Sequence, residues 1–377
     1  MNKICVYAIC KDEIKNVDQW LDSMSEADYI VVLDTGSTDG TFEKLKADPR
    51  VTKVQRGNIK PWRFDVARNR SMRLVPKDAN ILLCTDLDER LEPGWGDIIR
   101  ATWRENTLRG HYKYVWSHTD SGADGHTFTY DKLHTRDYKW YYPVHEVLGP
   151  KDGIDTQFEI ETPERVIEYG DKIVLRHYPD KDKSRSSYLD LLRLRVEENP
   201  DECYGMHLLG REYAAYGQYD LALMYLEKTL NLPSVSKSPL IQQATLGYMG
   251  DIYLMRQDYT DATTCFMLQI QNSPSHREAY LNMAEIYYHL KMYDVALSFI
   301  KEALNKTYQH FDWTERESTW NEQVDDLLSV IYSELGEYEK ALPCAVRALK
   351  KCPNNKRLQD NYLNIISKVE DKVETDG

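Results

Sequence analysis

The sequence lacks the features that mark a membrane-spanning, disulfide-rich or nucleic-acid-binding protein. It contains no run of about eighteen apolar residues, and residues 1–5 show no apolar core of a signal peptide. Seven cysteines without a C-x-x-C pair favour reduced thiols in a cytoplasmic setting over a disulfide framework. The formal net charge of -13 leaves no general excess of basic side chains for nucleic acid or an acidic membrane.

The chain is long enough for two domains, and its composition changes along its length. It has 377 residues, of which 42% are hydrophobic and 29% are charged, as in ordinary globular proteins. Most of the 27 tyrosines follow residue 110. We predict an α/β domain over residues 1–180, a polar junction at 181–187, helical repeats over 188–367 and a disordered tail at 368–377.

The first domain shows the rhythm of a parallel α/β sheet. Short apolar runs at residues 4–9, 29–33, 51–55 and 81–84 predict buried strands. Helical patterns separate them at residues 17–24, from Thr41 onward and at 62–74.

Two carboxylates follow the strand predicted at residues 81–84. In an extended chain Asp86 and Asp88 point to the same side, whereas Leu87 points to the other. Adjacent carboxylates repel each other unless a cation lies near them, and a divalent ion that also holds substrate phosphates would satisfy this. The alternative is a solvated turn that leads into the next element.

Polar residues also follow the second strand and open the third helix. Asp34 ends the second strand, and a loop rich in glycine and small hydroxyl residues, including Ser37, follows it. In open α/β sheets ligands bind beyond the carboxyl ends of strands, where this loop would lie. Asp65, Arg68 and Asn69 share one face of the third helix. An ordinary strand-to-helix turn and a solvated helix face are the alternatives.

Three segments together, Asp34-Thr35-Gly36-Ser37-Thr38-Asp39-Gly40-Thr41, Phe64-Asp65-Val66-Ala67-Arg68-Asn69 and Thr85-Asp86-Leu87-Asp88-Glu89, resemble the family-two glycosyltransferases with the GT-A fold. The resemblance implies a metal-dependent, inverting transfer of a sugar from a nucleotide-diphosphate sugar, with UDP-sugar as the expected donor. It implies that Asp34, Ser37, Asp65, Arg68 and Asp86 bind the donor, with Asp34 on the base. It also implies that Asp88 and Asp86 hold Mn²⁺ or Mg²⁺. Thr35 departs from the family, many members of which have a second aspartate there.

Residues 97–178 form the predicted acceptor side. Strands are expected at 112–118 and 127–130, around a turn at 121–125. Val144-His145-Glu146 and a later strand that ends in His177-Tyr178 resemble the branch of the family fused to helical repeats, the sublancin-type peptide glycosyltransferases. Residues 132–135, Lys-Leu-His-Thr, depart from the Arg-x-Phe-Arg of many members.

An inverting transfer needs a base that removes the acceptor's proton. Glu146 is the candidate, His145 is its competitor, and Asp120 and Asp124 are more remote alternatives. His177 is a candidate third metal ligand, since neutral imidazole ligates metals. A structural role is the alternative for both His177 and His134.

The second half repeats. Tyr213, Tyr253, Tyr287 and Tyr332 are each followed nine residues later by an alanine. The intervals of 40, 34 and 45 residues include one tetratricopeptide period and two with insertions. Such an array would bind a peptide or protein acceptor, form a homodimer or act as a structural support.

The sequence therefore predicts a glycosyltransferase whose acceptor is a peptide or protein side chain. Transfer to a glycan, a lipid or modified DNA is an alternative, with DNA disfavoured by the charge. A repeat scaffold with a catalytically silent front domain is a rival of another class. A nucleotidyltransferase is a third, but residues 4–13 lack its glycine-rich basic loop.

Overall fold

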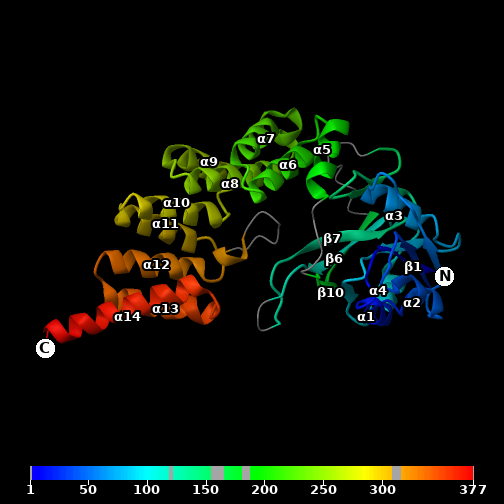
Figure 1. Cartoon of the computed structure of the whole chain (residues 1–377), viewed down its shortest axis with the longest axis horizontal. Helices are drawn as coiled ribbons and strands as arrows, with labels where there is room; N and C mark the ends of the chain where they lie inside the picture. Colours follow the sequence, from blue (N-terminus) through cyan, green and yellow to red (C-terminus); the bar gives the residue numbers. More distant parts are fainter. Residues whose placement is uncertain (1, 119–121, 154–164, 181–186, 308–315, 377) are drawn as a thin grey trace. The chain divides into compact units, whose positions relative to one another are not determined.

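A computed structural model describes residues 2–118, 122–153, 165–180, 187–307 and 316–376 of the chain. The chain forms two compact units, Met1–Gly205 and Met206–Gly377, which are described separately (Figure 1). Asp120 lies outside the described residues.

The first unit is built on an eight-stranded mixed sheet with the strand order β3-β2-β1-β4-β7-β6-β10-β5, and a two-stranded sheet, β8-β9, accompanies it. Its strands are β1 (Ile4–Cys10), β2 (Tyr29–Asp34), β3 (Lys53–Arg56), β4 (Ile81–Cys84), β5 (Glu89–Leu91), β6 (Arg109–Val115), β7 (Thr127–His134), β8 (Tyr138–Tyr141), β9 (Val147–Pro150) and β10 (Val166–His177). Its helices are α1 (Val17–Ser23), α2 (Thr41–Ala47), α3 (Phe64–Met72), α4 (Trp95–Thr102) and α5 (Tyr188–Glu198).

One half of the large sheet is parallel, as the apolar runs predict. Strand β1 pairs in parallel with β2 and with β4, and β2 pairs in parallel with β3. The chain moves outward from β1 to β3 and then returns to place β4 on the other side of β1. The gap between the carboxyl ends of β1 and β4 is thus the point at which the strand order reverses, where open α/β sheets bind ligands.

The two faces of this parallel half have different covers. Trp20 and Leu21 of α1, Leu45 of α2 and Ile99 of α4 share one apolar cluster with alternate residues of β1, β2 and β4. The opposite residues of these strands pack with the residues that follow α3 and with Tyr138, Trp140 and Leu148 of the β8-β9 pair. Both faces are buried, which explains why these strands are continuously apolar.

The other half of the sheet has three antiparallel junctions and one parallel junction, and it brings distant segments to β4. Strand β7 pairs antiparallel with β4 and with β6, and β10 pairs in parallel with β6. At its end β10 pairs antiparallel with β5, so that His177 lies opposite Glu89. The mixed sheet is compatible with a Rossmann-like domain.

The second unit is entirely helical in its described residues, and its helices stack as successive antiparallel pairs (Figure 1). The pairs are α6 (Cys203–Ala215) with α7 (Tyr219–Asn231), α8 (Pro239–Met255) with α9 (Tyr259–Asn272), α10 (Glu278–His289) with α11 (Tyr293–Leu304), and α12 (Gln323–Glu334) with α13 (Tyr338–Lys351), followed by α14 (Lys356–Asp376).

The repeated residues explain how each pair packs. The four tyrosines lie in the first helix of a pair, and the matching alanines, Ala222, Ala262, Ala296 and Ala341, are fully buried in the second. A Cβ atom at Gly250 would approach Phe266 Cε1 to 2.4 Å, so only glycine lets the two helices meet there. The predicted all-helical repeat architecture is confirmed.

Two segments differ from the sequence expectation. Helix α5, which was placed with the repeats, belongs to the first unit, where Arg195 donates to the Val144 and His145 carbonyl oxygens. Helix α14 continues to Asp376 over the residues that were expected to form a tail. Within the described residues, no helix combines the length and the apolar character that crossing a membrane requires.

Candidate functional site

The centre of the candidate site is a buried ion-pair network at the carboxyl end of β4. Arg68 of α3 donates from Nη1 and Nη2 to the two carboxylate oxygens of Asp86, over 2.9 and 3.0 Å. Its Nε donates to Glu146, and its Nη1 lies 3.3 Å from the Cys84 thiol. The Arg68 side chain is only 5% exposed. The guanidinium group of Arg68 therefore links helix α3 to the residue that precedes β9 and to the turn that follows β4.

A second cation completes this network. Lys132 of β7 lies 3.8 Å from Asp86 and stands over the Tyr130 ring at 4.5 Å. Burial acts to raise the pKa of Asp86 and of Glu146, but Arg68 and Lys132 outweigh it and hold both pKa values below their usual range. Both carboxyl groups are therefore ionised at neutral pH.

The second carboxylate of the motif faces a histidine instead. Asp88 Oδ2 lies 3.5 Å from His177 Nε2, and both side chains are largely buried. His177 Nδ1 lies 3.2 Å from the Trp116 carbonyl oxygen, and its ring stacks on that of Trp116 with centroids 4.5 Å apart. Burial lowers the pKa of His177, but Asp88 reverses this and raises it overall. Asp86 and Asp88 therefore have different partners, although they lie two residues apart.

Glu89 is a member of the site to which the sequence motifs gave no role. It is 1% exposed, accepts the Asp86 N–H over 2.9 Å and accepts the Tyr114 hydroxyl over 2.9 Å. Burial raises the pKa of its carboxyl group. Through these two hydrogen bonds Glu89 stabilises the turn between β4 and β5. Its position three residues after Asp86 is the sequence feature from which this role could have been predicted.

The loop after β2 is ordered by its own carboxylates. Asp34 is fully buried, and its Oδ1 accepts the Gly36 and Ser37 amides, each over 3.0 Å. Ser37 Oγ accepts the Asp12 amide over 2.9 Å, and Asp12 in turn accepts the Thr38 amide over 2.7 Å. This network joins the loops after β1 and β2 at the edge of the sheet where the strand order reverses.

The polar face of α3 is not solvated. Asp65 is 8% exposed and receives two hydrogen bonds from Arg63, each over 3.0 Å. Asn69 exchanges two hydrogen bonds with the backbone of Trp140. Arg68 lies between them and reaches Asp86. The helix thus uses its polar residues to join the loop before it, the β8 strand and the end of β4.

The position of Glu146 depends on a strained segment and a buried arginine. Tyr142 and His145 adopt positive φ values of 71° and 47°. Arg195 of α5 is fully buried, pairs with Glu202 over 2.9 Å and stands over the Tyr142 ring at 3.8 Å. The same guanidinium binds the two carbonyl oxygens that precede Glu146, so Arg195 fixes this segment. Nothing in the local sequence around Arg195 indicated this role.

The remaining predicted residues lie elsewhere. Asp124 pairs with Lys113 at 3.1 Å and with Arg176 at 2.5 Å. His134 is fully buried within a hydrogen-bond chain to Tyr7, at 2.8 Å, and to the Thr135 carbonyl oxygen, at 2.6 Å. Burial lowers the pKa of His134 to about 3, so it is a neutral structural side chain.

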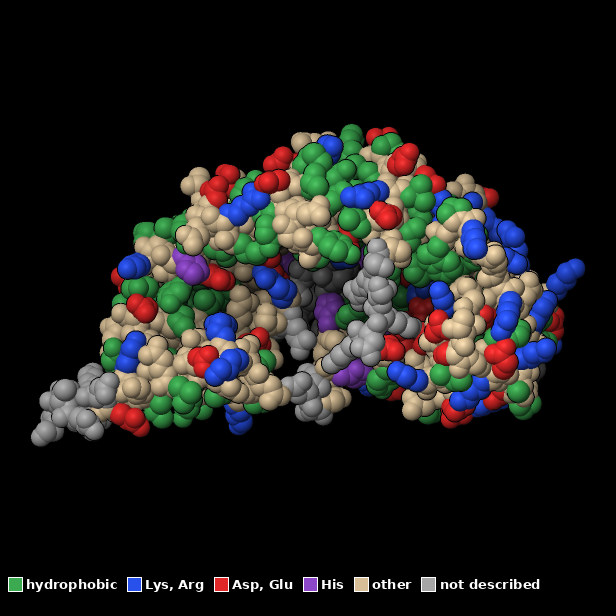
Figure 2. All heavy atoms as spheres, viewed as in Figure 1, with side chains coloured by type: hydrophobic (Ala, Val, Ile, Leu, Met, Phe, Trp, Pro, Cys, Tyr) green, Lys and Arg blue, Asp and Glu red, His purple; other side chains and the backbone are tan. Residues whose placement is uncertain are grey.

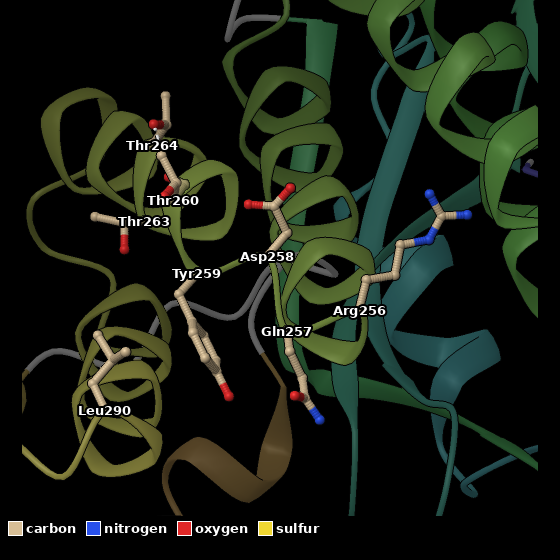
Figure 3. Close-up of a pocket in the computed structure, with 8 residues that line it drawn as sticks. All are labelled: Arg256, Gln257, Asp258, Tyr259, Thr260, Thr263, Thr264 and Leu290. Atoms are coloured by element: carbon tan, nitrogen blue, oxygen red, sulfur yellow. Dashed lines mark hydrogen bonds between the residues drawn. The ribbon is translucent and has the colours of Figure 1, made fainter.

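Among the described residues, no three His, Cys, Asp or Glu side chains converge as a metal site. A depression of about 800 Å³ lies instead in the second unit, lined by the turn between α8 and α9 and by Leu290 (Figure 3). Its acid, Asp258, caps α9 by accepting the Asp261 amide, and its Arg256 points away to pair with Asp220 at 2.7 Å. These contacts show that the polar residues around the depression stabilise the turn between two helices of the repeats.

The surface charge agrees with the composition. Acidic and basic side chains are interspersed over the visible face of each unit, and neither face is uniformly basic (Figure 2). This pattern gives no support to nonspecific nucleic-acid binding.

Comparison with known proteins identifies the repeats. The family model of the tetratricopeptide repeat matches residues 278–305, which cover α10 and α11. No curated protein matches the chain. A tetratricopeptide repeat protein of Thermus thermophilus is 18% identical, with 48% of this chain and 90% of that chain covered and a TM-score of 0.37.

Two further solved structures are similar to this chain. YrrB, a repeat protein with an unusual peptide-binding site, is 14% identical over 48% of this chain and 84% of its own, with a TM-score of 0.35. The first repeat domain of Spaghetti (RPAP3), bound to the HSP90 peptide SRMEEVD, is 19% identical over 34% of this chain and 96% of its own, with a TM-score of 0.30. The family match by itself shows a tetratricopeptide repeat over α10 and α11 of the helical C-terminal region.

Proposed function

We propose that the first unit is a metal-dependent glycosyltransferase that moves a sugar from a nucleotide-diphosphate sugar, with UDP-sugar as the expected donor. One observation carries the proposal: Asp34 ends β2, and Asp86 and Asp88 follow β4, at the edge of the sheet where the strand order reverses. Ligands of open α/β sheets bind at that edge. The order of these motifs along the chain also resembles the family-two transferases.

The residues of the site divide into those that shape the donor pocket and those that face a metal ion. Asp34 and Ser37 order the loops that would surround the nucleotide, through the hydrogen bonds to Gly36 and Asp12. Asp65 fixes the start of α3 through Arg63. Arg68 and Asp86 neutralise each other, so their role toward the donor is to fix the end of β4 beside which it would bind.

Asp88 and His177 fit a divalent ion. Two ligands of one octahedral ion lie roughly 3 Å apart at bond lengths of about 2.1 Å, and their facing atoms are 3.5 Å apart. With the Nδ1 proton on the Trp116 carbonyl oxygen, His177 would present the Nε2 lone pair, the arrangement typical of ligating histidines. Asp86 is bound to Arg68 and so contributes charge rather than a ligand bond. The other ligands would be donor phosphate oxygens and water.

A bound Mn²⁺ or Mg²⁺ would stabilise the negative charge that develops on the leaving diphosphate. The protein's part is to hold a base on the acceptor side. Glu146 is ionised and fixed by Arg68, and its backbone is fixed by Arg195. It is our candidate for the group that accepts the acceptor's proton because of its place in the motif, whereas its lowered pKa makes it a weak base. His145 remains the second candidate, although its contact with the Tyr188 ring, with centroids 5.7 Å apart, directs it toward α5.

For the acceptor, we propose a peptide or protein side chain held by the repeats. The family model of the tetratricopeptide repeat matches α10 and α11, and stacked repeats of this kind form extended concave surfaces that bind such partners. A homodimer formed through the repeats is the alternative use of the array. Glycan, lipid and modified-DNA acceptors are the alternative substrates.

The experiment that tests the proposal compares Asp88→Asn with Asp97→Asn. Asp97 lies on α4 with a side chain that is 96% exposed, so its substitution changes the net charge equally and leaves the site intact. UDP with Mn²⁺ should raise the melting temperature of the wild type and of Asp97→Asn, because a ligand that binds only the folded state stabilises it. Asp88→Asn should lose this shift and should no longer hydrolyse UDP-sugar.

Two results would overturn the proposal. Equal metal-dependent hydrolysis by Asp88→Asn and the wild type would remove Asp88 from the metal site. The absence of any shift with UDP, GDP or their sugars would favour a repeat scaffold with a silent front domain. Glu146→Gln should retain the shift and lose transfer; loss of the shift would make Glu146 a structural residue.

A further inference from the structure

The segment between α11 and α12 departs from the repeat pattern. The interval from Tyr287 to Tyr332 is 45 residues, 11 more than the 34 from Tyr253 to Tyr287. The extra residues lie between Leu304, the end of α11, and Gln323, the start of α12. This connection contains a short 3-10 helix, Glu317–Thr319, and connections of this length are usually functional or linker segments.

The described part of this segment places one arginine against two neighbouring repeats. Arg316 donates from Nε to Glu278 Oε1 over 2.5 Å and from its backbone amide to Glu278 Oε2 over 2.6 Å. Its Nη2 lies 3.3 Å from Asp251 of α8 and 3.3 Å from Asn282 Oδ1 of α10. One guanidinium group thus contacts the first helices of two repeats.

The flanks of the segment are fixed separately from Arg316. Arg277 donates to the Ala303 carbonyl oxygen over 3.0 Å and to the Lys306 carbonyl oxygen over 2.8 Å. The same guanidinium stands over the Trp320 ring at 3.7 Å. Since Arg277 anchors both flanks, holding the segment in place does not by itself require Arg316 to enter the acidic pocket.

The pocket has unused capacity for a ligand. Asn282 is 2% exposed, points its amide oxygen at Arg316, and its Nδ2 finds no hydrogen-bond partner among the described residues. A buried donor of this kind would bind a carbonyl oxygen of a peptide backbone, which would relieve the cost of leaving it unpaired. The Arg316 side chain is 48% exposed, so the pocket opens to solvent.

The charge of the pocket is also unbalanced. Asp251 and Glu278 face one guanidinium group, and Glu285, which also has His289 at 3.9 Å and Arg357 as cationic neighbours, lies nearby. Burial raises the pKa of Asp251 to about 6; Arg316 opposes this rise, whereas Glu278 and Glu285 add to it. A cationic ligand is what this pocket lacks.

We propose that Asp251, Glu278 and Asn282 form a binding site for an arginine side chain of a partner peptide, and that Arg316 occupies this site in cis until such a peptide displaces it. The planar guanidinium group suits the site because it bonds to a carboxylate and to a side-chain amide oxygen at once. Lysine offers a point charge and would make fewer of these bonds. The proposal concerns binding alone and does not depend on the transferase chemistry.

The test measures binding of a fluorescein-labelled glycine peptide with one central arginine to the full-length chain by fluorescence anisotropy. Arg316→Ala should bind it about tenfold or more tightly than the wild type, because removing the cis ligand raises the fraction of open sites. In the Arg316→Ala background, Glu278→Gln should lose this gain. Glu302→Gln in the same background is the control, since Glu302 is an exposed acid of α11.

A second peptide and a milder variant keep the test decisive. A lysine peptide should bind Arg316→Ala at least about fivefold more weakly than the arginine peptide. Arg316→Lys retains the charge and most of the side-chain volume, and it should give intermediate affinity if the alanine variant misfolds. Equal affinity of the wild type and both Arg316 variants would overturn the proposal. So would equal binding of the arginine and lysine peptides.

Discussion

Replacement of Arg68 by methionine should destabilise the first unit far more than the same replacement at Arg50. The two arginines make matched contacts: each forms a two-point bond with one aspartate and a single bond with another acid. Arg50 donates to Asp48 over 2.9 and 2.8 Å and to Asp22 over 2.5 Å. They differ in exposure, since the Arg50 side chain is 34% exposed and that of Arg68 is 5% exposed.

The expected magnitude follows from this difference. Methionine at position 68 would leave the Asp86 and Glu146 carboxylates without the guanidinium that both contact. Lys132, at 3.8 Å from Asp86, would be the cation that remains beside them. Breaking a buried ion pair by removing one partner costs about 3–5 kcal/mol. An exposed pair such as that of Arg50 is worth about 0–1 kcal/mol.

The pH dependence should change in a defined direction. In the wild type the pKa values of Asp86 and Glu146 are below their ordinary values of 3.8 and 4.5, so the stability they contribute is present above those values and is lost on acidification. Without Arg68, burial would dominate and raise both pKa values, so the cost in the variant would grow as the pH rises. The loss of stability caused by Arg68→Met should therefore be larger at pH 7 than at pH 4.5.

Tryptophan fluorescence during denaturant unfolding gives the measurement. Most of the tryptophans lie within the first unit, so the signal reports mainly on its unfolding. The free energy of unfolding of Arg68→Met, Arg50→Met and the wild type should be compared at both pH values. A loss below about 1 kcal/mol for Arg68→Met, or a loss that does not depend on pH, would refute the assignment of Arg68 as the charge that holds this network together.

Two further predictions concern the cores. Tyr7→Phe removes the hydroxyl that accepts Trp140 Nε1–H and contacts His134, each at 2.8 Å, so denaturant unfolding should show a loss of about 1–3 kcal/mol; Tyr29→Phe, which loses an exposed bond to Asp78, is the control, and equal losses would contradict the buried chain. Gly250→Ala should lower the melting temperature followed by circular dichroism, because its Cβ would press on the Phe266 ring at a cost of about 1–3 kcal/mol; an unchanged melting temperature would contradict the close approach of α8 and α9.

The regular elements were predictable because their signals are local. The apolar runs predicted β1, β2 and β4 within one residue, since strands buried on both faces must be apolar throughout. The Tyr–Ala spacing predicted the repeat helices because both residues fill fixed positions in each pair. The ends of β6 were less accurate, since it covers Arg109–Val115 rather than residues 112–118, and the early part of β10, from Val166, lies in a stretch with β-bulges that no apolar pattern marks.

The site was predictable as a set of motifs but not as a set of contacts. The positions of Asp86, Asp88 and Arg68 follow from their elements, and the sequence motifs indicate all three. Their partners depend on strand order, which brings β7 and β10 beside β4 and β5. Hence the pairing of Asp88 with His177, 89 residues apart in sequence, could be suspected only from resemblance. The hydrogen bonds from Arg195 to the segment before Glu146 could not be predicted, because no sequence feature near Arg195 indicates them.

The charges of the side chains at the end of β4 indicate why the proposed donor would need a metal ion in order to bind. Arg68 and Lys132 carry two positive charges, and the ionised Asp86 and Glu146 balance them. Glu89 adds no positive charge, whatever its protonation state. The network therefore offers a diphosphate no net attraction, and the pair of Asp88 and His177 adds no net positive charge even when the imidazole is protonated. Under the proposed function, donor binding requires a divalent ion at Asp88 and His177 to reverse the local charge. The affinity for UDP should accordingly depend on metal even before any sugar is transferred, and metal-independent binding of UDP would refute this division of charge.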